Sequence, residues 1–243
     1  MNELHHLDEF NQALANYQPS ADAMKTLADI KLVALMGPSG GGRNTIIDEL
    51  MKTGEYYFTV SDTTRQPRLN DGVLEQDGRE YWFRNEADML ADIQAGKFLE
   101  AEVIHAQQVS GTSIRELQKA LEAGKTALCD ADLGGIMNML NLKPDTIAVL
   151  VLPPSFEEWQ RRFTSRTKMP VEEVRRRMNT AIAIFETGLS DDRLHLIVND
   201  DYKLAAQHIQ ALKGSEKPAN SPETYLLCQQ LLDQTRAMLA SLQ

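Results

Sequence analysis

The amino-acid sequence predicts an α/β fold with a parallel sheet at its core and helices flanking that sheet. The first observation is a set of short apolar runs, at 31–36, 126–132, 146–152 and 194–200, which have the length of buried strands. The second is that helix-like patterns separate these runs, as the crossover helices of a parallel sheet do. The third is the glycine-rich stretch "MGPSGGGRNT", which follows the first run and leads into a helix-like segment.

The other elements follow in order along the chain. An amphipathic N-terminal helix, ended by "YQPS", is predicted from the near-helical spacing of Leu4, Leu7, Phe10, Leu14 and Tyr17. Further helices are expected from about residue 43, near 113–123 and from 155 to 187, with a mixed region after the first of them. These elements are enough for one sizeable domain with additions, or for two small domains.

The C-terminal part is predicted to be a linker followed by a helix. The stretch 213–223 is polar and rich in linker residues, and Ser221 and Pro222 are typical of a helix start. The helix carries an apolar stripe made of Tyr225, Leu227, Leu231, Leu232, Leu239 and Leu242. This stripe must be covered by the domain, by the N-terminal helix or by a second subunit, so self-association through the terminal helices is one alternative.

Charge and composition exclude several classes of partner. The 243 residues carry a formal net charge of -10, which argues against nucleic acid or an anionic membrane surface as the main partner. Cys129 and Cys228 are far apart and fit no zinc-ligand spacing, so two reduced thiols are expected. No run has the length of a membrane span or a signal peptide. A cytoplasmic protein is the expectation.

The glycine-rich turn is the first candidate site. Small residues there let backbone N–H groups point at an anion near the positive end of a helix dipole. The candidate phosphate loop consists of Gly37, Ser39, Gly40, Gly41, Gly42, Arg43, Asn44 and Thr45. Taken alone, such a turn indicates either phosphate binding or tight packing of a helix against a strand. The pattern GxxxxGK[ST] would place lysine and a hydroxyl where this chain has Arg43 and Asn44.

The stretches after this loop resemble the guanylate kinase family in order, spacing and residue type. The resemblance covers about residues 31–213 and is carried by five motifs. The motifs are SxTTRxxR (Ser61, Thr63, Thr64, Arg65, Arg68), GxxYxF (Gly78, Tyr81, Phe83), FLE (Phe98, Leu99, Glu100), GTS (Gly111, Thr112, Ser113) and DxDxxG (Asp130, Asp132, Gly135).

The resemblance implies a phosphate-loop sheet core, a small GMP-binding subdomain and a helical lid, with extra helices at both ends. The expected organisation is an N-terminal helical extension over 1–30, a kinase-like domain over 31–213 and a linker with a C-terminal helix over 214–243. Within the domain, the GMP-binding region would span about 61–115 and the lid about 160–180.

The resemblance also implies which residues bind the acceptor GMP. Its phosphate would be held by Arg65, Arg68 and Tyr81, with Ser61 nearby; two guanidinium forks suit a doubly charged monophosphate. Glu100 would receive the N–H groups of guanine, with Thr112 and Asp132 completing recognition of the base. Adenine has an acceptor where guanine has a ring donor, so a carboxylate there favours guanine.

On the donor side, the resemblance implies ATP with Mg²⁺. Arg162, Arg166 and Arg177 would form the lid over the ATP phosphates, with Arg43, Arg166 and Arg177 acting in catalysis. Asn199 would lie near the adenine. Mg²⁺ would arrive with the nucleotide and take protein ligands from Asn44 and Asp130.

Two departures from the family pattern narrow the hypotheses. Arg43 keeps the charge of the usual lysine but is longer and planar, and Asn44 replaces the usual Mg²⁺-binding hydroxyl, with Thr45 one position later. Before Gly111 the chain has "QQVSG", with Val109 and Ser110, in place of a tyrosine-containing segment, so one monophosphate contact is lost or rebuilt.

Three functions therefore stand. The first is phosphoryl transfer from ATP to GMP or dGMP, slowed by Arg43 and Asn44. The second is a catalytically impaired domain that binds a guanine nucleotide or a phosphorylated partner as a sensor or interaction module. The third is kinase chemistry on a different phosphorylated acceptor. The retained base-recognition residues favour the first.

Overall fold

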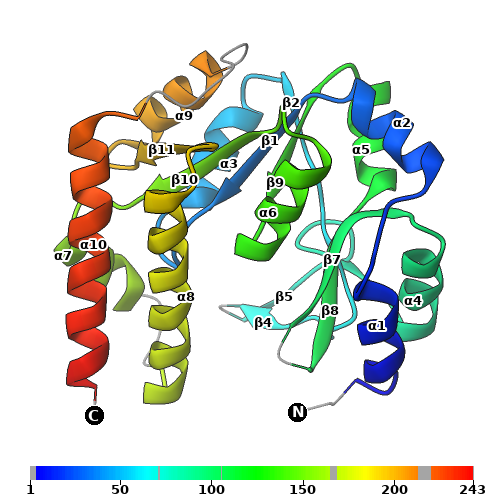
Figure 1. Cartoon of the computed structure of the whole chain (residues 1–243), viewed down its shortest axis with the longest axis horizontal. Helices are drawn as coiled ribbons and strands as arrows, with labels where there is room; N and C mark the ends of the chain where they lie inside the picture. Colours follow the sequence, from blue (N-terminus) through cyan, green and yellow to red (C-terminus); the bar gives the residue numbers. More distant parts are fainter. Residues whose placement is uncertain (1–3, 71, 105, 165–168, 213–219, 243) are drawn as a thin grey trace. The chain divides into compact units, whose positions relative to one another are not determined.

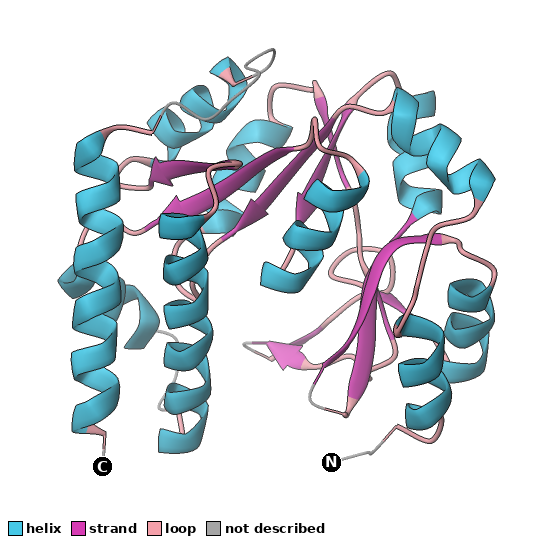
Figure 2. Cartoon of the chain, viewed as in Figure 1, coloured by secondary structure: helices cyan, strands magenta, loops and turns pink. Residues whose placement is uncertain are grey.

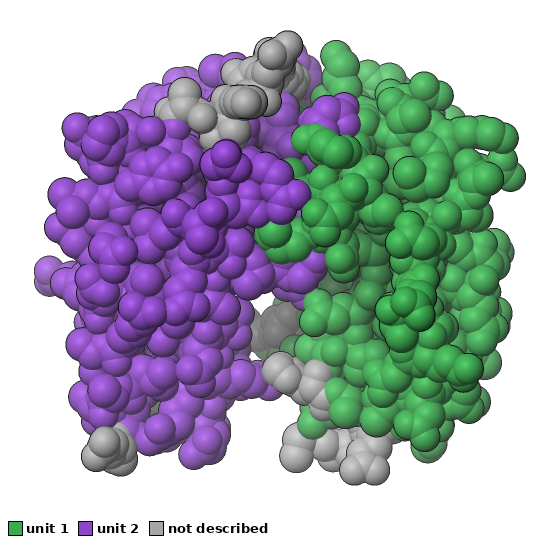
Figure 3. Space-filling view, in the orientation of Figure 1, with its two compact units in different colours: residues 1–32, 56–129, 137–144 green, residues 33–55, 130–136, 145–243 purple. Residues whose placement is uncertain are grey.

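The structure is a computed structural model that describes residues 4–70, 72–104, 106–164, 169–212 and 220–242. The chain divides into two compact units (Figure 3). Unit 1 contains residues 1–32, 56–129 and 137–144, and unit 2 contains residues 33–55, 130–136 and 145–243. The domain limits expected from the sequence stay predictions.

Unit 2 is built on parallel strands, as the apolar runs predict. Its strands are β1 (Leu32–Met36), β10 (Ile147–Leu152) and β11 (Leu194–Val198). Strand β10 lies between the other two and pairs with both in parallel, with Ala34 opposite Ala148 and Val149 opposite His195. All five residues of β1 are buried, which is typical of a strand covered on both faces.

Helices surround these strands in unit 2 (Figures 1 and 2). They are α3 (Arg43–Met51), α7 (Phe156–Thr164), α8 (Val171–Ser190), α9 (Tyr202–Ala211) and α10 (Pro222–Ser241). Helix α3 packs against α9, and α10 packs against α7, α8 and β11. The hydroxyl of Ser221 accepts a hydrogen bond from the Thr224 N–H and caps α10, as predicted. Leu231 and Leu232 of the predicted apolar stripe are buried, and the other four residues of the stripe are half-buried, so unit 2 covers part of it.

Unit 1 holds one parallel strand pair and a mixed sheet. Strand β2 (Tyr56–Phe58) pairs in parallel with β9 (Thr126–Asp130). The mixed sheet has the order β6-β3-β8-β7, and β4 and β5 form a separate hairpin. The bounds are β3 (Asp62–Thr63), β4 (Leu69–Asn70), β5 (Val73–Leu74), β6 (Trp82–Phe83), β7 (Phe98–Ile104) and β8 (Gln108–Ser113).

The helices of unit 1 include two from the N-terminal extension. They are α1 (Leu7–Leu14), α2 (Ala21–Asp29), α4 (Glu86–Gln94) and α5 (Ile114–Glu122), and α6 (Leu133–Leu142) begins in unit 2 and continues in unit 1. Helix α1 packs against α4 and β7, and α2 packs against α5. Phe10 is fully buried in a cluster with Phe98 and Val109. The apolar face of the predicted N-terminal helix is therefore covered within unit 1.

The predicted fold class is confirmed, with a parallel sheet and flanking helices. Helices α2, α4, α6 and α9 were not individually predicted from the sequence. Both cysteines are free and buried, which agrees with the expected reduced thiols. Within the described residues, no helix is long and apolar enough to cross a membrane.

Candidate functional site

The phosphate loop has the backbone shape that its glycines suggest. It connects β1 to α3, and α3 begins at Arg43. Gly40 and Gly42 have φ angles of 83° and 91°, a region that residues with a Cβ rarely adopt. A Cβ on Gly42 would also collide with the side-chain amide of Asn199. The glycine at 42 is therefore required twice, once by the backbone and once by its neighbour.

Arg43 is fixed between the loop and the end of β9. Its Nε donates a 2.6 Å hydrogen bond to Asp130 Oδ1, and its Nη1 donates to the carbonyl oxygen of Gly37. The Arg43 side chain is 23% exposed and that of Asp130 is 27% exposed, so solvent screens this ion pair only in part. The sequence left the position of this guanidinium open, and the structure places it against the loop.

The other altered position of the loop faces solvent. Asn44 and Thr45 are exposed residues in the first turn of α3. No group of three or more His, Cys, Asp or Glu side chains capable of holding a metal occurs among the described residues. A resident metal centre therefore has no support in the described part of the chain, and a cation here would depend on phosphate oxygens.

Two of the three predicted lid arginines form hydrogen bonds here, one with a residue of the phosphate loop and one with a residue that contacts the loop. Arg177, on α8, donates from Nη1 to the Ser39 hydroxyl at 2.9 Å. Arg162, on α7, donates from Nη1 to the Asn199 carbonyl oxygen at 3.2 Å. The third, Arg166, lies outside the described residues.

Asn199 is close to the loop, and its amide bonds to it. The residue is buried, and its Nδ2 donates to the Gly41 carbonyl oxygen at 2.9 Å. The buried Trp159 supports the same loop, because its indole N–H donates to the Ser39 carbonyl oxygen at 2.8 Å. That Asn199 lies near the adenine stays a prediction. Its hydrogen bond to Gly41 gives Asn199 a structural role as well.

In unit 1, the predicted GMP-phosphate residues Arg65 and Tyr81 are in contact. The Arg65 guanidinium lies 4.6 Å from the centre of the Tyr81 ring and 5.5 Å from that of Phe83. Both terminal nitrogens of Arg65 bond to the two carboxylate oxygens of Glu75, with a distance of 2.9 Å for Nη2. Arg68 is exposed, and its backbone N–H also donates to Glu75, at 2.8 Å.

Burial and charge act in opposite directions on Arg65. Desolvation lowers the pKa of Arg65, but hydrogen bonding and attraction to Glu75 outweigh it and raise the pKa above the usual value. The guanidinium therefore keeps its charge although its side chain is only 9% exposed. Ser61 is half-buried in the same unit, just before β3.

Glu100 and Thr112, the predicted guanine contacts in unit 1, lie opposite each other on β7 and β8. Glu100 is 8% exposed, and its Oε1 accepts a 2.9 Å hydrogen bond from the Thr112 backbone N–H. Adjacent Gly111 lets the strands approach, since a Cβ there would collide with the Glu100 carbonyl oxygen. Asp132 belongs to unit 2, where its Oδ1 accepts from the Gly135 N–H at 2.8 Å at the start of α6.

Comparison with known proteins decides the family. A family model described as guanylate kinase matches residues 29–214. The chain belongs to the guanylate kinase family.

Individual relatives agree with this assignment. The chain is 36% identical over 184 residues to the guanylate kinase of Corynebacterium diphtheriae, covering 75% of this chain and 93% of that one. It is 36% identical to the guanylate kinase of Nocardia farcinica, with 75% and 92% covered. It is 34% identical to guanylate kinase 1 of Arabidopsis thaliana, of which only 47% is covered. The crystal structure of guanylate kinase from Anaplasma phagocytophilum shares the fold, with a TM-score of 0.58 at 22% identity over 77% of this chain and 86% of that chain.

The second departure from the guanylate kinase pattern has a structural explanation. Val109 is fully buried in the cluster that also contains Phe10 of α1. Ser110 donates from its hydroxyl to the Thr63 hydroxyl at 2.8 Å, inside the sheet. The pair at 109 and 110 therefore serves the packing of unit 1, where the N-terminal extension lies against the sheet.

Sequence reasoning missed the carboxylates that hold the arginines of this guanylate kinase family member. Glu158 bonds to Arg162 Nε at 2.7 Å, and Glu173 bonds to Arg177 Nε at 2.6 Å. Both pairs have the i, i+4 spacing that brings side chains together on a helix, so the sequence did carry that signal. The Glu75 partner of Arg65 lies in the segment after the β4–β5 hairpin and had no such signal.

A second missed cluster centres on Asp62, the variable position of the SxTTR motif. Asp62 is fully buried and forms ion pairs with Arg84 at 2.5 Å and Arg115 at 2.8 Å. Burial raises the pKa of Asp62, although both arginines act against the shift. Arg84 also bonds to Asp92 at 2.8 Å. The cluster ties β3 to α4 and α5 within unit 1.

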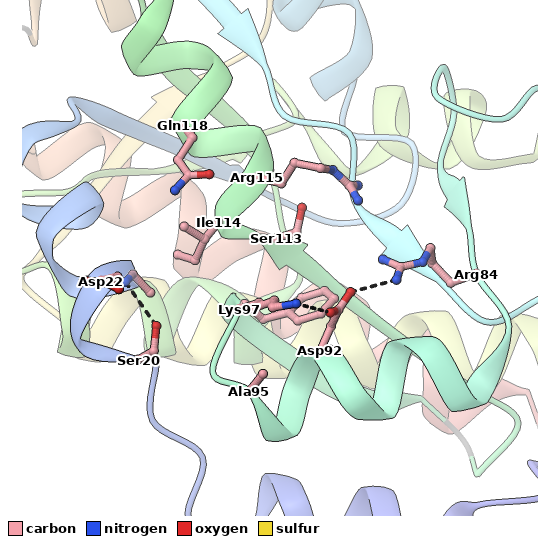
Figure 4. Close-up of a pocket in the computed structure, with 12 residues that line it drawn as sticks. Ser20, Asp22, Arg84, Asp92, Ala95, Lys97, Ser113, Ile114, Arg115 and Gln118 are labelled. Carbon is pink, nitrogen blue, oxygen red and sulfur yellow. Dashed lines mark hydrogen bonds and ion pairs between the residues drawn. The ribbon is translucent and has the colours of Figure 1, made fainter.

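Unit 1 also contains a cavity of about 570 Å³ beside this cluster (Figure 4). Its lining comes from α2, α4 and α5 and from the strand starts between them, and includes Arg84, Lys97 and Arg115. The Ser113 hydroxyl at its edge is buried and has no hydrogen-bond partner among the described residues. None of the residues predicted from the sequence to bind GMP lines this cavity.

Proposed function

We propose that this chain transfers a phosphoryl group from ATP to GMP, or to dGMP, and releases ADP and GDP or dGDP. Membership of the guanylate kinase family supports this reaction. The observation that carries the proposal is the phosphate loop, which keeps its positive-φ glycines and accepts a hydrogen bond from the lid arginine Arg177 through Ser39. A loop that served packing alone would have no need of an arginine from α8.

The donor half binds ATP mainly through backbone groups. The N–H groups at the start of α3 and the positive end of its dipole attract the phosphates, and Arg43, Arg162 and Arg177 add positive charge. Phosphoryl transfer needs alignment and neutralisation of the negative charge that spreads over the transferred group, with little covalent work by the protein. Arg43 supplies this charge from a position fixed by Asp130 and Gly37. Arg166 completes the proposed set of catalytic arginines.

Mg²⁺ fits the oxygen donors of this half as an ion carried by the nucleotide. Asn44 offers an exposed amide oxygen, and Asp130 offers a carboxylate of which Arg43 bonds to Oδ1. Hard cations such as Mg²⁺ prefer oxygen ligands and use one or two protein groups together with substrate phosphates. Asn44 and Asp130 would hold the ion together with the nucleotide, and the ion would withdraw negative charge from the donor phosphates.

The acceptor half reads GMP through side chains. Arg65, with Arg68 and Tyr81, is proposed to bind the monophosphate, because Arg65 is charged, ordered by Glu75 and placed over the Tyr81 ring. Ser61 is proposed to contribute its hydroxyl to the same phosphate. Glu100 is proposed to accept the ring N–H and the 2-amino group of guanine, with Thr112 and Asp132 completing the contacts.

A product assay tests this function directly. Purified chain is incubated with ATP, MgCl₂ and, in separate reactions, GMP, dGMP, AMP, CMP and UMP, and the products are resolved by anion-exchange chromatography. The proposal expects GDP and dGDP and at least about 100-fold less product from AMP, because a buried carboxylate discriminates strongly against an unpaired acceptor. Calorimetric binding of GMP without any turnover would instead favour a sensor, and turnover of another monophosphate would favour a different acceptor.

A further inference from the structure

The N-terminal extension is built into the sheet that carries Glu100. The family match begins at residue 29, so α1 and most of α2 lie before it. Within unit 1, α1 packs against α4 and β7, and Phe10 is fully buried beside Phe98 (Figure 1). Removing these residues from water contributes to the stability of the unit, but burial by itself assigns no function to the extension.

One hydroxyl of this extension makes two bonds to the strand. The Tyr17 hydroxyl donates to the Phe98 carbonyl oxygen at 2.7 Å, and the Tyr17 hydroxyl oxygen accepts from the Phe98 N–H at 2.9 Å. A tyrosine hydroxyl can donate one bond and accept others, so both contacts are compatible with one phenol. Both backbone polar groups of Phe98 are thus bonded by a single side chain.

These two bonds occur where the strand is irregular. Phe98 lies opposite Ser113 and Glu100 lies opposite Thr112, so β7 has one residue more than β8 between these pairs. Such a bulge interrupts the ladder and redirects the side chains next to it. The direction of Glu100 therefore depends on how the bulge is held, and Tyr17 holds it.

A close approach fixes the segment that follows Tyr17. The Ser20 N–H donates to the Gly96 carbonyl oxygen at 2.9 Å. Gly96 has a φ of 66°, and a Cβ there would lie 2.5 Å from the Ser20 nitrogen. Ser20 lines the unit 1 cavity together with Lys97 and Phe98 (Figure 4). The extension is thus anchored at two points, Gly96 and Phe98, directly before the bulge.

We propose that Tyr17 is a positioning residue for base recognition, whose hydroxyl fixes the β7 bulge so that the Glu100 carboxylate meets guanine. The inference rests on the proposed role of Glu100 and assigns to the N-terminal extension a part in substrate specificity. The Tyr17 hydroxyl itself contacts no substrate. Its effect passes through the backbone of Phe98 and reaches Glu100 two residues later.

The acidity of the phenol agrees with this arrangement. The pKa of Tyr17 is raised to about 12, mainly by burial; the bond to the Phe98 carbonyl opposes this shift and the negative charge of Glu100 adds to it. The hydroxyl therefore remains a donor to the Phe98 carbonyl at every pH at which the enzyme would be assayed.

The test compares Tyr17→Phe with the native chain and with Tyr57→Phe as a matched control. Tyr57 is another tyrosine of unit 1, and its hydroxyl donates to Glu116 at 3.3 Å. Steady-state kinetics are measured with GMP and with inosine monophosphate, which keeps the ring N–H of guanine but lacks its 2-amino group. Glu100→Gln is measured in the same series.

Loss of one well-placed hydrogen bond to the base weakens binding by about tenfold. Tyr17→Phe is therefore expected to raise the KM for GMP about tenfold, to leave the KM for ATP unchanged and to reduce the preference for GMP over inosine monophosphate by a similar factor. Hydrogen exchange provides a second measurement, in which segment 98–104 of Tyr17→Phe loses protection while Tyr57→Phe keeps it. This second measurement remains informative if the variant is too unstable for kinetics.

The outcomes separate this inference from the proposed function. If Tyr17→Phe keeps the native KM for GMP and the native preference between the two nucleotides, Tyr17 only anchors the extension and the inference is overturned. If Glu100→Gln leaves GMP kinetics unchanged, or if the native chain shows no saturation by GMP, the proposed role of Glu100 is itself contradicted, whatever the result for Tyr17→Phe. A loss of kcat shared equally by both nucleotides would also contradict a positioning role.

Discussion

The donor residues of unit 2 and the acceptor residues of unit 1 hold their arginines in different ways. In unit 2, Arg43 and Arg177 bond to the phosphate loop itself, through a carbonyl oxygen and a serine hydroxyl. In unit 1, Arg65 is fixed by a carboxylate and by aromatic rings. As proposed, the donor half would depend on backbone geometry, whereas the acceptor half would depend on individual side chains.

A loop that binds phosphate through backbone groups would tolerate the departures from the family pattern at Arg43 and Asn44. Backbone N–H groups bind phosphate whatever side chain follows them, so a loop can keep its main function through a substitution. A carboxylate that binds the base, or a guanidinium that binds a phosphate, cannot be replaced by backbone groups when its side chain is substituted. Substitutions in unit 1 should therefore be more harmful than equally conservative ones in unit 2.

The largest effect is expected from Arg65→Gln. The variant removes the cation proposed to bind the GMP phosphate and leaves Glu75, which is only 7% exposed, without its bidentate partner. Truncating one member of such a charge pair costs about 2–5 kcal/mol, so kcat/KM for GMP should fall by about 100-fold or more. Arg79→Gln, an exposed arginine of the same unit, is the control and should stay near the native value. Equal losses of kcat/KM for GMP in both variants would show that Arg65 does not bind the GMP phosphate.

Arg177→Gln should have the next largest effect. Arg177 is proposed to stabilise charge on the transferred phosphoryl group, and removing one such donor costs about 100-fold in kcat. Its neighbour Arg176 also pairs with Glu173 and provides the matched control. The measurement is kcat at saturating ATP and GMP for both variants. A rise confined to the KM for ATP, with kcat unchanged, would show that Arg177 only binds ATP, without a part in the chemical step.

The sequence predicted the backbone of the proposed donor half better than the contacts that hold its side chains. The glycine loop and the helix start at residue 43 follow from local patterns, and the structure places both as expected. The partner of Arg43, however, is Asp130, 87 residues further along the chain. Such a contact depends on which strand ends lie side by side, and no local spacing encodes it.

The missed elements have comparable physical reasons. Helix α6, "LGGIMNMLNL", has two glycines near its start and only Asn138 and Asn141 as polar side chains, so no clear polar face marks it as a helix. The bulge in β7 could not be predicted from the sequence either, because it appears only in the register in which β7 pairs with β8. Tyr17 could be predicted as an apolar position of an N-terminal helix, but the structure assigns its hydroxyl to Phe98.

A smaller effect separates conformational from steric demands in the loop. Gly42→Ala should weaken ATP binding by about tenfold and lower Tm, because Ala at a positive φ costs about 1 kcal/mol and its Cβ collides with Asn199. Gly54 also has a positive φ, of 73°, but nothing lies within 4 Å of its Cβ position. Gly54→Ala should therefore show the conformational cost alone, with native ATP affinity. Calorimetric titration with an ATP analogue and thermal unfolding measure both; equal behaviour of the two variants would contradict the steric role.

The smallest expected effect is a difference between the two units in how their stability changes as the pH falls. Burial lowers the pKa of His195 in β11, so the folded state of unit 2 binds this proton less readily than the unfolded chain. Stability from this group is complete above the ordinary value of 6.5 and is lost as the pH falls below it. Asp62 in unit 1 has a raised pKa, and its contribution to stability grows as the pH falls toward 3.8.

Hydrogen exchange at pH 7.5 and pH 5.5, corrected for the intrinsic rates, checks this difference. Strand β11 should lose protection at the lower pH, and His195→Gln should remove part of that loss. If the variant and the native chain lose the same protection in β11, another group causes the acid response.

The central claim is that the altered loop of unit 2 is a working donor half. The most direct measurement is coupled ADP release with ATP, Mg²⁺ and GMP, run on the native chain beside the double variant Arg43→Lys, Asn44→Ser. Arg43 is held by Asp130 and Gly37 within the loop, so the native chain should turn over in a GMP-dependent way, with the double variant equal to it or faster. No turnover by the native chain, together with clear turnover by the double variant, would contradict the account.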